Sequence, residues 1–327
     1  MKFGLMTSLL LGQVVFSSAI WVQGAQNASS NGIGSQASTN SDESLLTLHS
    51  TVSEVQLVFT VTDKHGHYVT ELKQEDFDIL DDRKPPEKIL SFRSETDLPL
   101  QVGLLIDTSQ SVRERFTFEQ EAAIAFLNQS LRPKYDQAFV IGFDLTPRVT
   151  QDFTDDIGKL AVGIRLLRPG TLTAMYDAVY YSCNKLLKQS QNRPVRRVLI
   201  LLSDGNDNAS SVTRERAIEI AQQAEVSVYT IETSLAAGGR GQKNLEAIAA
   251  KTGERSYVPT QITEVANAFA AIQTELRSQY AVSYKPEGFK LDGHYRTIEI
   301  RTPKKHGLQI RSRTGYRSAQ IAGASDR

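Results

Sequence analysis

The feature that most constrains the fold is a continuous apolar segment at 102–106 that ends at Asp107. A strand that is apolar on both faces is typical of a parallel sheet with helices on each side, because neither face meets water. A segment with helical spacing follows at 112–131, with Ala122 and Phe126 on one face. These two neighbours predict the beginning of an α/β domain.

The same alternation continues through the middle of the chain. Further strands are predicted at 138–143, 198–202, 226–231 and 256–258, an antiparallel edge strand near 149–153, and helices at 174–187, 213–224, 244–251 and 262–276. Strands that alternate with helices favour a doubly wound sheet. We therefore expect 97–277 to form a Rossmann-like α/β domain, with a mainly parallel sheet and helices on both faces.

The segments on either side of this region, 46–95 and 279–317, have the period of β-strands instead. Strands are predicted at 55–61, 68–70, 77–80, 89–92, 280–284, 296–301 and 308–313, the last two joined by a turn at 303–307. Each segment has too few strands for a core of its own. We expect the two segments to pair as a small β-sandwich with the α/β domain inserted between them. Two independent modules are the alternative.

The N-terminus predicts export. Lys2 precedes an uncharged, mainly apolar run at 3–22, and small residues follow it. This pattern is typical of a signal peptide, here 1–25, although the run is long enough to act as an uncleaved anchor. Residues 26–45 are polar and predict a flexible linker, and 318–327 predict a flexible tail. The expected location is periplasmic or secreted.

Charge and cysteine content narrow the possible functions. Lys+Arg and Asp+Glu are equal at 37 each, so the net charge does not favour nucleic acid or a membrane surface as a partner. A local excess of basic residues near the C-terminus is interpreted as solvated strand faces. The one cysteine, Cys183, excludes an intrachain disulfide and is expected to be a buried core residue.

Carboxylates and hydroxyls gather where predicted strands end. The first strand runs into Asp107, Ser109 and Ser111, a later strand runs into Asp204, and Thr173 comes just before a helix. Ligands of open α/β sheets bind at this edge. Any one of these turns alone is more simply a helix cap. Two carboxylates at one edge repel each other, however, and a hard cation with oxygen ligands relieves that repulsion.

This three-part pattern resembles the metal-ion-dependent adhesion site (MIDAS) of von Willebrand factor type A domains. The resemblance covers roughly 97–277. Shorter motifs also resemble the acidobacterial-type subgroup: Val61-Thr62-Asp63 with Gly66, Glu75-Asp76-Phe77, Leu98-Pro99-Leu100, Tyr176-Asp177-Ala178 and Gly315-Tyr316.

The resemblance implies a ligand set for Mg²⁺, Mn²⁺ or Ca²⁺. Ser109 and Ser111 are expected to bind the ion directly, Thr173 to bind it when a partner is engaged, and Asp107 and Asp204 to act mainly through water. Neutral hydroxyl ligands leave the ion partly positive, so a partner Asp or Glu can complete its coordination.

The identity of the threonine ligand has two candidates. Family members usually carry the threonine directly after Gly-Gly, which gives Thr171, next to Gly170, as the alternative to Thr173. Nearby acids have simpler interpretations. Asp207 is expected to be a surface acid or an auxiliary ligand, and Asp177 a first-turn acid of a helix.

The expected function is therefore a non-enzymatic adhesion or assembly module that captures an acidic group of a partner protein. No nucleophile elbow, phosphate-binding loop or dinucleotide fingerprint occurs in the sequence. All five histidines lie outside 97–277. The alternatives are a metal-free structural scaffold and a metal-dependent phosphoester hydrolase.

Overall fold

A computed structural model describes residues 54–94, 98–189, 195–234, 238–261 and 263–318. These ranges belong to one compact unit, Thr47–Arg327. The predicted signal peptide, the linker and nearly all of the tail lie outside them. Within these ranges, no helix combines the length and the apolar character that are needed to cross a bilayer.

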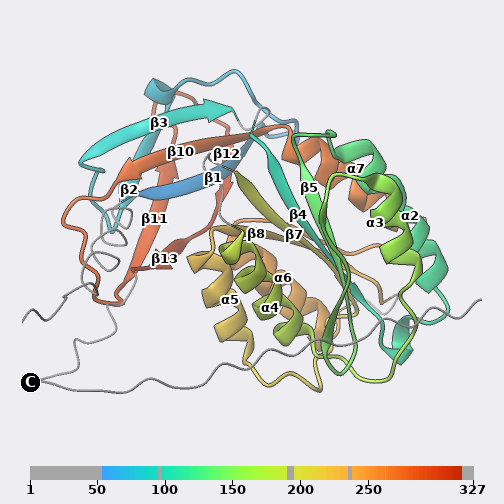
Figure 1. The fold of residues 1–327 in the computed structure, drawn as a ribbon. Coiled ribbons are helices and arrows are strands. Elements are labelled where there is room, and N and C mark those ends of the chain that lie inside the picture. The colour runs from blue at the N-terminus through green and yellow to red at the C-terminus, as the bar shows by residue number, and fades with distance from the viewer. Residues whose placement is uncertain (1–53, 95–97, 190–194, 235–237, 262, 319–327) are drawn as a thin grey trace, which may run out of the picture. The chain divides into compact units, whose positions relative to one another are not determined.

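The centre of the unit is a six-stranded sheet in the order β6-β5-β4-β7-β8-β9 (Figure 1). Its strands are β4 (Leu100–Asp107), β5 (Gln137–Phe143), β6 (Pro147–Thr154), β7 (Arg196–Ser203), β8 (Val226–Glu232) and β9 (Ser256–Tyr257). All neighbours run parallel except β5 and β6, which are antiparallel. This confirms the predicted α/β class and the antiparallel edge strand.

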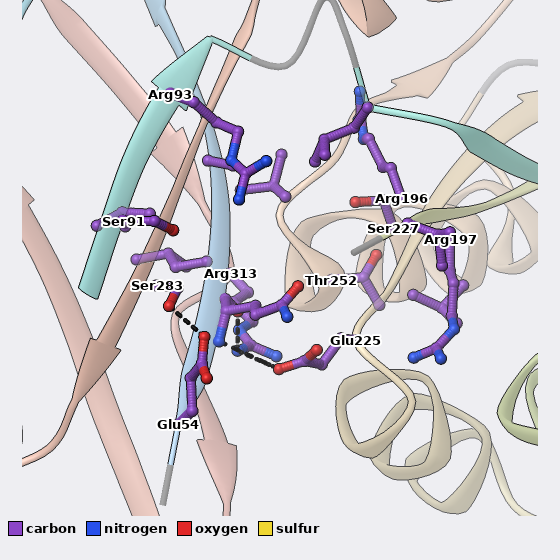
Figure 2. Close-up of a pocket in the computed structure, with 18 of the residues that line it drawn as sticks. Glu54, Ser91, Arg93, Arg196, Arg197, Glu225, Ser227, Thr252, Ser283 and Arg313 are labelled. Atoms are coloured by element: carbon purple, nitrogen blue, oxygen red, sulfur yellow. Dashed lines mark hydrogen bonds and ion pairs between the residues drawn. The ribbon is translucent and has the colours of Figure 1, made fainter. Parts of the chain in front are cut away.

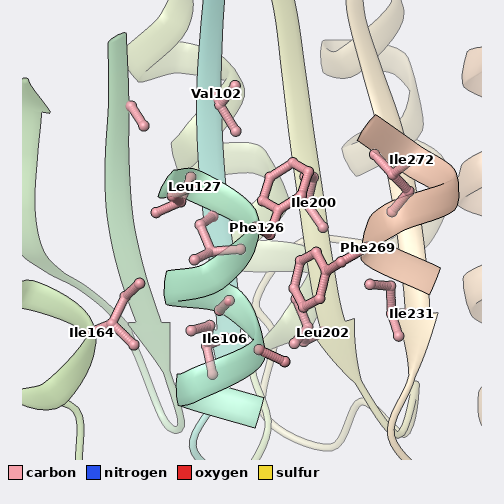
Figure 3. Close-up of a cluster of buried hydrophobic side chains, with 14 of the residues drawn as sticks. Val102, Ile106, Phe126, Leu127, Ile164, Ile200, Leu202, Ile231, Phe269 and Ile272 are labelled. Atoms are coloured by element: carbon pink, nitrogen blue, oxygen red, sulfur yellow. The ribbon is translucent and has the colours of Figure 1, made fainter. Parts of the chain in front are cut away.

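Helices cover both faces of this sheet. The helices are α2 (Phe116–Ser130), α3 (Ile157–Arg165), α4 (Met175–Lys188), α5 (Arg214–Gln223), α6 (Arg240–Thr252) and α7 (Glu264–Leu276). Side chains of α2, α3 and α7 form one core with β4, β7 and β8, where Phe126 and Phe269 stack at 4.9 Å between ring centroids (Figure 3). Helices α4, α5 and α6 form a second core on the other face, which includes Cys183. Each large side chain buried in this way contributes about 1.5–3 kcal/mol.

The helices differ from the sequence prediction in three places. Helix α2 begins at Phe116, later than predicted, because a 3-10 turn at Gln110–Val112 precedes it. Helix α6 begins before its predicted start, since the polar residues of its first turn show no apolar period. Helix α3 was not predicted. It is short, and the Asp156 side chain caps it by accepting a hydrogen bond from the Lys159 N–H.

Two antiparallel sheets combine strands from both β-rich segments. One has the order β12-β1-β10-β3, with β12 (Gln309–Ser312), β1 (Val55–Thr62), β10 (Gln279–Lys285) and β3 (Lys88–Ser94). The other has the order β13-β11-β2, with β13 (Gly315–Arg317), β11 (Tyr295–Arg301) and β2 (Asp78–Asp81). Apolar side chains of both sheets share a third core, in which Phe59, Phe77 and Tyr280 make aromatic contacts.

One strand prediction in this region was wrong. The expected strand at 68–70 is a single bridge between Tyr68 and Thr62. The strands predicted at 296–301 and 308–313 are present as β11 and β12, and they lie in different sheets. Strand β11 pairs with β2 and β13, whereas β12 pairs with β1, so the connection between them passes from one sheet to the other.

Several of the basic residues near the C-terminus form ion pairs with buried carboxylates, which corrects their interpretation as solvated strand faces. Arg311 of β12 contacts Glu254 at 3.0 Å and also pairs with Glu275 of α7. Arg296 donates to the buried Asp81 at 2.6 Å. The alternating pattern places these residues on a strand, but it cannot show that a second element covers that strand.

Candidate metal-binding site

The Asp107 side chain is held in place at the C-terminal end of β4. It is fully buried, and its Oδ1 accepts a 2.8 Å hydrogen bond from the Ser109 N–H. Its Oδ2 accepts a 2.6 Å hydrogen bond from the hydroxyl of Ser203, the last residue of the neighbouring strand β7. The parallel pairing of β4 with β7 brings the two residues together.

The two serines of the motif lie close to each other. The Ser109 Oγ is 2.9 Å from the Ser111 Oγ. Ser109 has extended backbone angles and is followed by the 3-10 turn at Gln110–Val112, which brings the second hydroxyl back beside the first. Ser109 is buried, whereas Ser111 is exposed, so the pair reaches from the sheet edge to solvent.

Asp204 follows β7 at a turn that needs glycine. Gly205 has a φ of 75°, and a Cβ on it would lie 2.2 Å from the Gly241 carbonyl oxygen. A Cβ on Gly241 would lie 2.0 Å from the Asp204 carbonyl oxygen. The backbones therefore meet with no side chain between them. The Asp204 carboxylate accepts a 2.9 Å hydrogen bond from the Asn206 N–H.

Thr173 is attached to the loop that follows Asp204. Its N–H donates to the Asn208 Oδ1 at 2.9 Å, and its carbonyl accepts from the N–H groups of Asn208 and Ala209. Thr173 is 3% exposed, whereas Thr171 is an exposed residue. The structure thus brings Thr173 to the loop that follows Asp204 and leaves Thr171 at the surface.

Asp177 and Asp207 hold this loop in place. Asp177, in the first turn of α4, accepts hydrogen bonds from the N–H groups of Ser211 and Val212. Asp207 accepts from the Tyr176 N–H at 3.0 Å and from a serine hydroxyl at 2.6 Å. Both carboxylates are occupied by loop contacts.

The site gathers carboxyl groups whose negative charge is made costly by burial. Burial raises the pKa of Asp107 to about 6; hydrogen bonds from Ser203 and Ser109 oppose this rise, and the nearby Asp204 adds to it. Burial also raises the pKa of Glu119 to about 8, with Arg115 lowering it and Asp107 and Asp204 raising it. Three acids thus influence one another at this edge.

Sequence reasoning missed Glu119 and Ser203. Glu119 lies on α2, is fully buried, and neither of its carboxylate oxygens has a hydrogen-bond partner. Its Oε1 is 3.7 Å from the Arg115 Nε. The helical period gave a signal, because Glu119 shares the apolar face with Ala123 and Phe126, where a charged residue is unexpected.

The donor groups suit a divalent cation. In the described part of the chain, no ion pair links Asp107 or Asp204 to a basic side chain. No three His, Cys, Asp or Glu side chains within the described ranges gather as a metal cluster. Two carboxylates with hydroxyls are instead a hard, all-oxygen set, which matches Mg²⁺, Mn²⁺ or Ca²⁺.

Comparison with protein families identifies the central region. The family model described as the von Willebrand factor type A domain matches residues 101–271, just over half of the chain. The match runs from β4 into α7 and so includes all strands of the central sheet. It does not support the narrower acidobacterial-type subgroup. No curated protein gives a significant match.

Solved structures give weaker likenesses. Proximal thread matrix protein 1 from the mussel byssus, with a zinc-occupied MIDAS motif, has a TM-score of 0.48 and 16% identity over 60% of this chain and 49% of that chain. The PilB minor pilin from Streptococcus sanguinis has a TM-score of 0.44 and 15% identity over 60% of this chain and 63% of that chain. The vWF domain of the type V pili tip protein Mfa5 from Porphyromonas gingivalis has a TM-score of 0.44 and 15% identity over 54% of this chain and 94% of that chain. This chain spans about half of the mussel protein. Since these scores are below 0.5, the family assignment rests on the sequence model.

Proposed function

Because the chain belongs to the von Willebrand factor type A domain family, we propose that it is an exported, non-enzymatic protein that binds a partner through a divalent cation. The cation-binding residues in this proposal are Asp107, Ser109, Ser111, Thr173 and Asp204. The partner presents an Asp or Glu side chain, whose carboxylate completes the coordination of the ion.

One observation carries the proposal. Asp107 is buried, each of its oxygens accepts a hydrogen bond, and Ser203, one of the two donors, precedes Asp204. A carboxylate that is fixed in this way orients water or metal without moving. The fixed acid next to Asp204, with no basic ion-pair partner in the described ranges, is the arrangement that a bound cation would neutralise.

The paired hydroxyls determine what the cation can do when it is bound. Ser109 and Ser111 are neutral donors 2.9 Å apart, so they hold an ion without cancelling its charge. The ion supplies the positive charge that attracts the partner's carboxylate. Thr173, whose N–H donates to Asn208 in the loop after Asp204, is proposed to add a third hydroxyl when the partner is bound.

The proposal of a binding protein, rather than an enzyme, has support from the roles of the acids. Asp107, Asp177 and Asp207 accept hydrogen bonds that hold the sheet edge and its loops. A general base needs a free oxygen within reach of its substrate. Incubation of the Mg²⁺- or Mn²⁺-loaded protein with a generic phosphoester tests this part, and metal-dependent turnover would contradict it.

Export is proposed from the apolar run at 3–22, which lies outside the described residues. N-terminal sequencing of protein recovered from outside the cytoplasm is expected to show cleavage after the small residues that follow the run. Recovery of soluble cytoplasmic protein that begins at Met1 would contradict export.

Partner binding is tested by pull-down from an envelope extract in Mg²⁺ or in EDTA. Wild-type protein is expected to retain a partner only with Mg²⁺, and Asp107→Ala is expected to lose it. Asp78→Ala is the matched control, because Asp78 is an exposed residue of the sandwich strand β2. Retention of the same partner by Asp107→Ala in EDTA would contradict a metal-dependent interaction.

A further inference from the structure

A second concave site lies between the α/β domain and the four-stranded sheet (Figure 2). The first residues of β7 and β8 line one side of it, and residues of β1, β3 and β10 line the other. The cavity volume of the cleft is about 80 Å³. This is room for several water molecules or for one compact ion.

Positive charge dominates the lining of the cleft. Four arginines line it: Arg93, Arg196, Arg197 and Arg313. Two carboxylates, Glu54 and Glu225, line it as well. Arg313 pairs with Glu225 at 3.9 Å, and Arg196 pairs with the buried Glu254 at 3.6 Å, so the positive excess comes from Arg93 and Arg197. A partly enclosed site with this balance attracts anions.

Three of the arginines are held by the protein itself. Arg196 donates to the Leu276 carbonyl at 3.1 Å. Arg197 donates to the Ala224 carbonyl, just after α5, at 3.1 Å. Arg313 donates to the Gln222 carbonyl at 3.2 Å. These contacts fix the positions of the guanidinium groups before any ligand arrives, which lowers the entropic cost of binding.

Arg93 differs from the other three. Its side chain extends from β3 toward the cleft (Figure 2), and no described residue forms a hydrogen bond or ion pair with it. Its guanidinium therefore offers hydrogen-bond donors to the cleft that the described part of the chain does not satisfy.

We infer that this cleft binds a small molecule that carries a carboxylate or phosphate group, with Arg93 as its principal contact. A guanidinium forms two parallel hydrogen bonds with either oxyanion. The hydroxyls of Ser91 and Ser227 also line the cleft and can add further hydrogen bonds. The carboxylates Glu54 and Glu225 oppose the binding of extended polyanions, so the ligand is expected to be compact.

The cleft is separate from the candidate metal site. Arg196 and Val226 begin their strands, whereas Asp107 and Asp204 lie at or just beyond the ends of theirs. An eight-residue strand spans about 25 Å. The inference is therefore independent of the proposed function, and anion binding is expected to persist in EDTA.

The test is calorimetric titration of the protein in EDTA with inorganic phosphate and, separately, with succinate, at ionic strength matched with NaCl. Wild-type protein is expected to bind at least one of them saturably, and the two titrations distinguish phosphate from carboxylate ligands. Arg93→Gln is expected to weaken binding about tenfold or more, and Arg93→Glu to abolish it.

Arg165→Gln is the matched control, because Arg165 is an exposed arginine on α3 that does not line the cleft. It is expected to bind the anion as the wild type does. Circular dichroism of each variant checks that the fold is retained, which an exposed side chain without a described partner should allow. Absence of saturable binding of both anions up to about 10 mM, or equal affinity in Arg93→Glu, would overturn the inference.

Discussion

The hydroxyl of Ser203 donates a 2.6 Å hydrogen bond to the Oδ2 of Asp107, across the boundary between β7 and β4. This bond joins the first residue of the Asp-x-Ser-x-Ser motif to the residue that precedes Asp204. The Ser203 Oγ also accepts a 3.0 Å hydrogen bond from the Gly205 N–H. One hydroxyl thus connects Asp107 of the first strand end to the turn that carries Asp204.

Ser203→Ala is expected to weaken metal binding while the fold is kept. The substitution removes a donor from a buried carboxylate, which costs about 1–3 kcal/mol, and it lets Asp107 rotate away from the ion. Ser182→Ala is the control, because the buried Ser182 hydroxyl donates within α4 to the Ala178 carbonyl. Metal titration and urea unfolding of both variants measure the effect. Equal metal affinity in the two variants would show that the bond does not position Asp107.

The choice between Thr173 and Thr171 is tested by their alanine variants. Thr173→Ala is expected to leave resting metal binding nearly unchanged but to impair capture of an acidic partner, because its hydroxyl is expected to engage in the bound state. Thr171→Ala is expected to have only a mild effect on partner capture, since Thr171 is exposed. Partner binding in Mg²⁺ for both variants is the measurement. A larger loss in Thr171→Ala would reverse the assignment.

Glu119 is expected to make the metal-free protein less stable as the pH rises. Burial raises its pKa from 4.5 to about 8 in the folded state. Between these values the folded protein holds a proton that the unfolded chain has released, so the free energy of unfolding falls as the pH increases. Each unit of pKa difference between the folded and unfolded states corresponds to about 1.4 kcal/mol in the free energy of unfolding.

Glu119→Gln removes this titration and keeps the size of the side chain. In EDTA, wild type and variant are expected to have similar unfolding free energies near pH 5, and the variant is expected to be more stable near pH 9. Urea unfolding across this pH range tests the difference. Parallel curves for the two proteins would mean that Glu119 ionises freely in the folded state.

The sequence predicts the α/β domain well because its strands are buried on both faces. The apolar runs at 102–106 and 198–202 favour a covered parallel sheet, because predicted helices separate them. The ends of those strands then place Asp107 and Asp204 at one edge. The predicted residues come from segments that the structure connects by hydrogen bonds, although their role in metal binding stays a prediction.

What the sequence could not show is how side chains pair across long distances. Arg311 pairs with Glu254, in the loop between α6 and β9, and with Glu275 of α7. Hydrophobic period identifies a strand and its inward face, but ion pairs between elements depend on how those elements pack. The helical period placed Glu119 on the apolar face of α2, but it could not show that packing buries the carboxyl group completely and raises its pKa.

The ion pairs of Arg311 are expected to stabilise the contact between strand β12 and the α/β domain. Glu254 and Glu275 are almost completely buried, so Arg311→Leu leaves two carboxylates without their main counter-charge. We expect a loss of about 3–5 kcal/mol in the free energy of unfolding. Arg301→Leu removes an exposed pair with Glu299, which solvent screens, so it is expected to cost far less stability. Similar losses in the two variants by urea unfolding would contradict a stabilising role for the buried pair.

The central claim, that this sheet edge holds a divalent cation, is tested most directly by calorimetric titration of purified protein with Mg²⁺ and Mn²⁺. Wild-type protein is expected to bind one ion, Ser109→Ala to bind it more weakly, and Asp107→Ala and Asp107→Asn to show no binding while they remain folded. The Asn variant keeps the size of the side chain and removes its charge, so its failure would assign the effect to the carboxylate. Unchanged metal affinity in Asp107→Ala and Asp204→Ala, or no binding by the wild type, would contradict the claim and leave these residues as helix and loop caps.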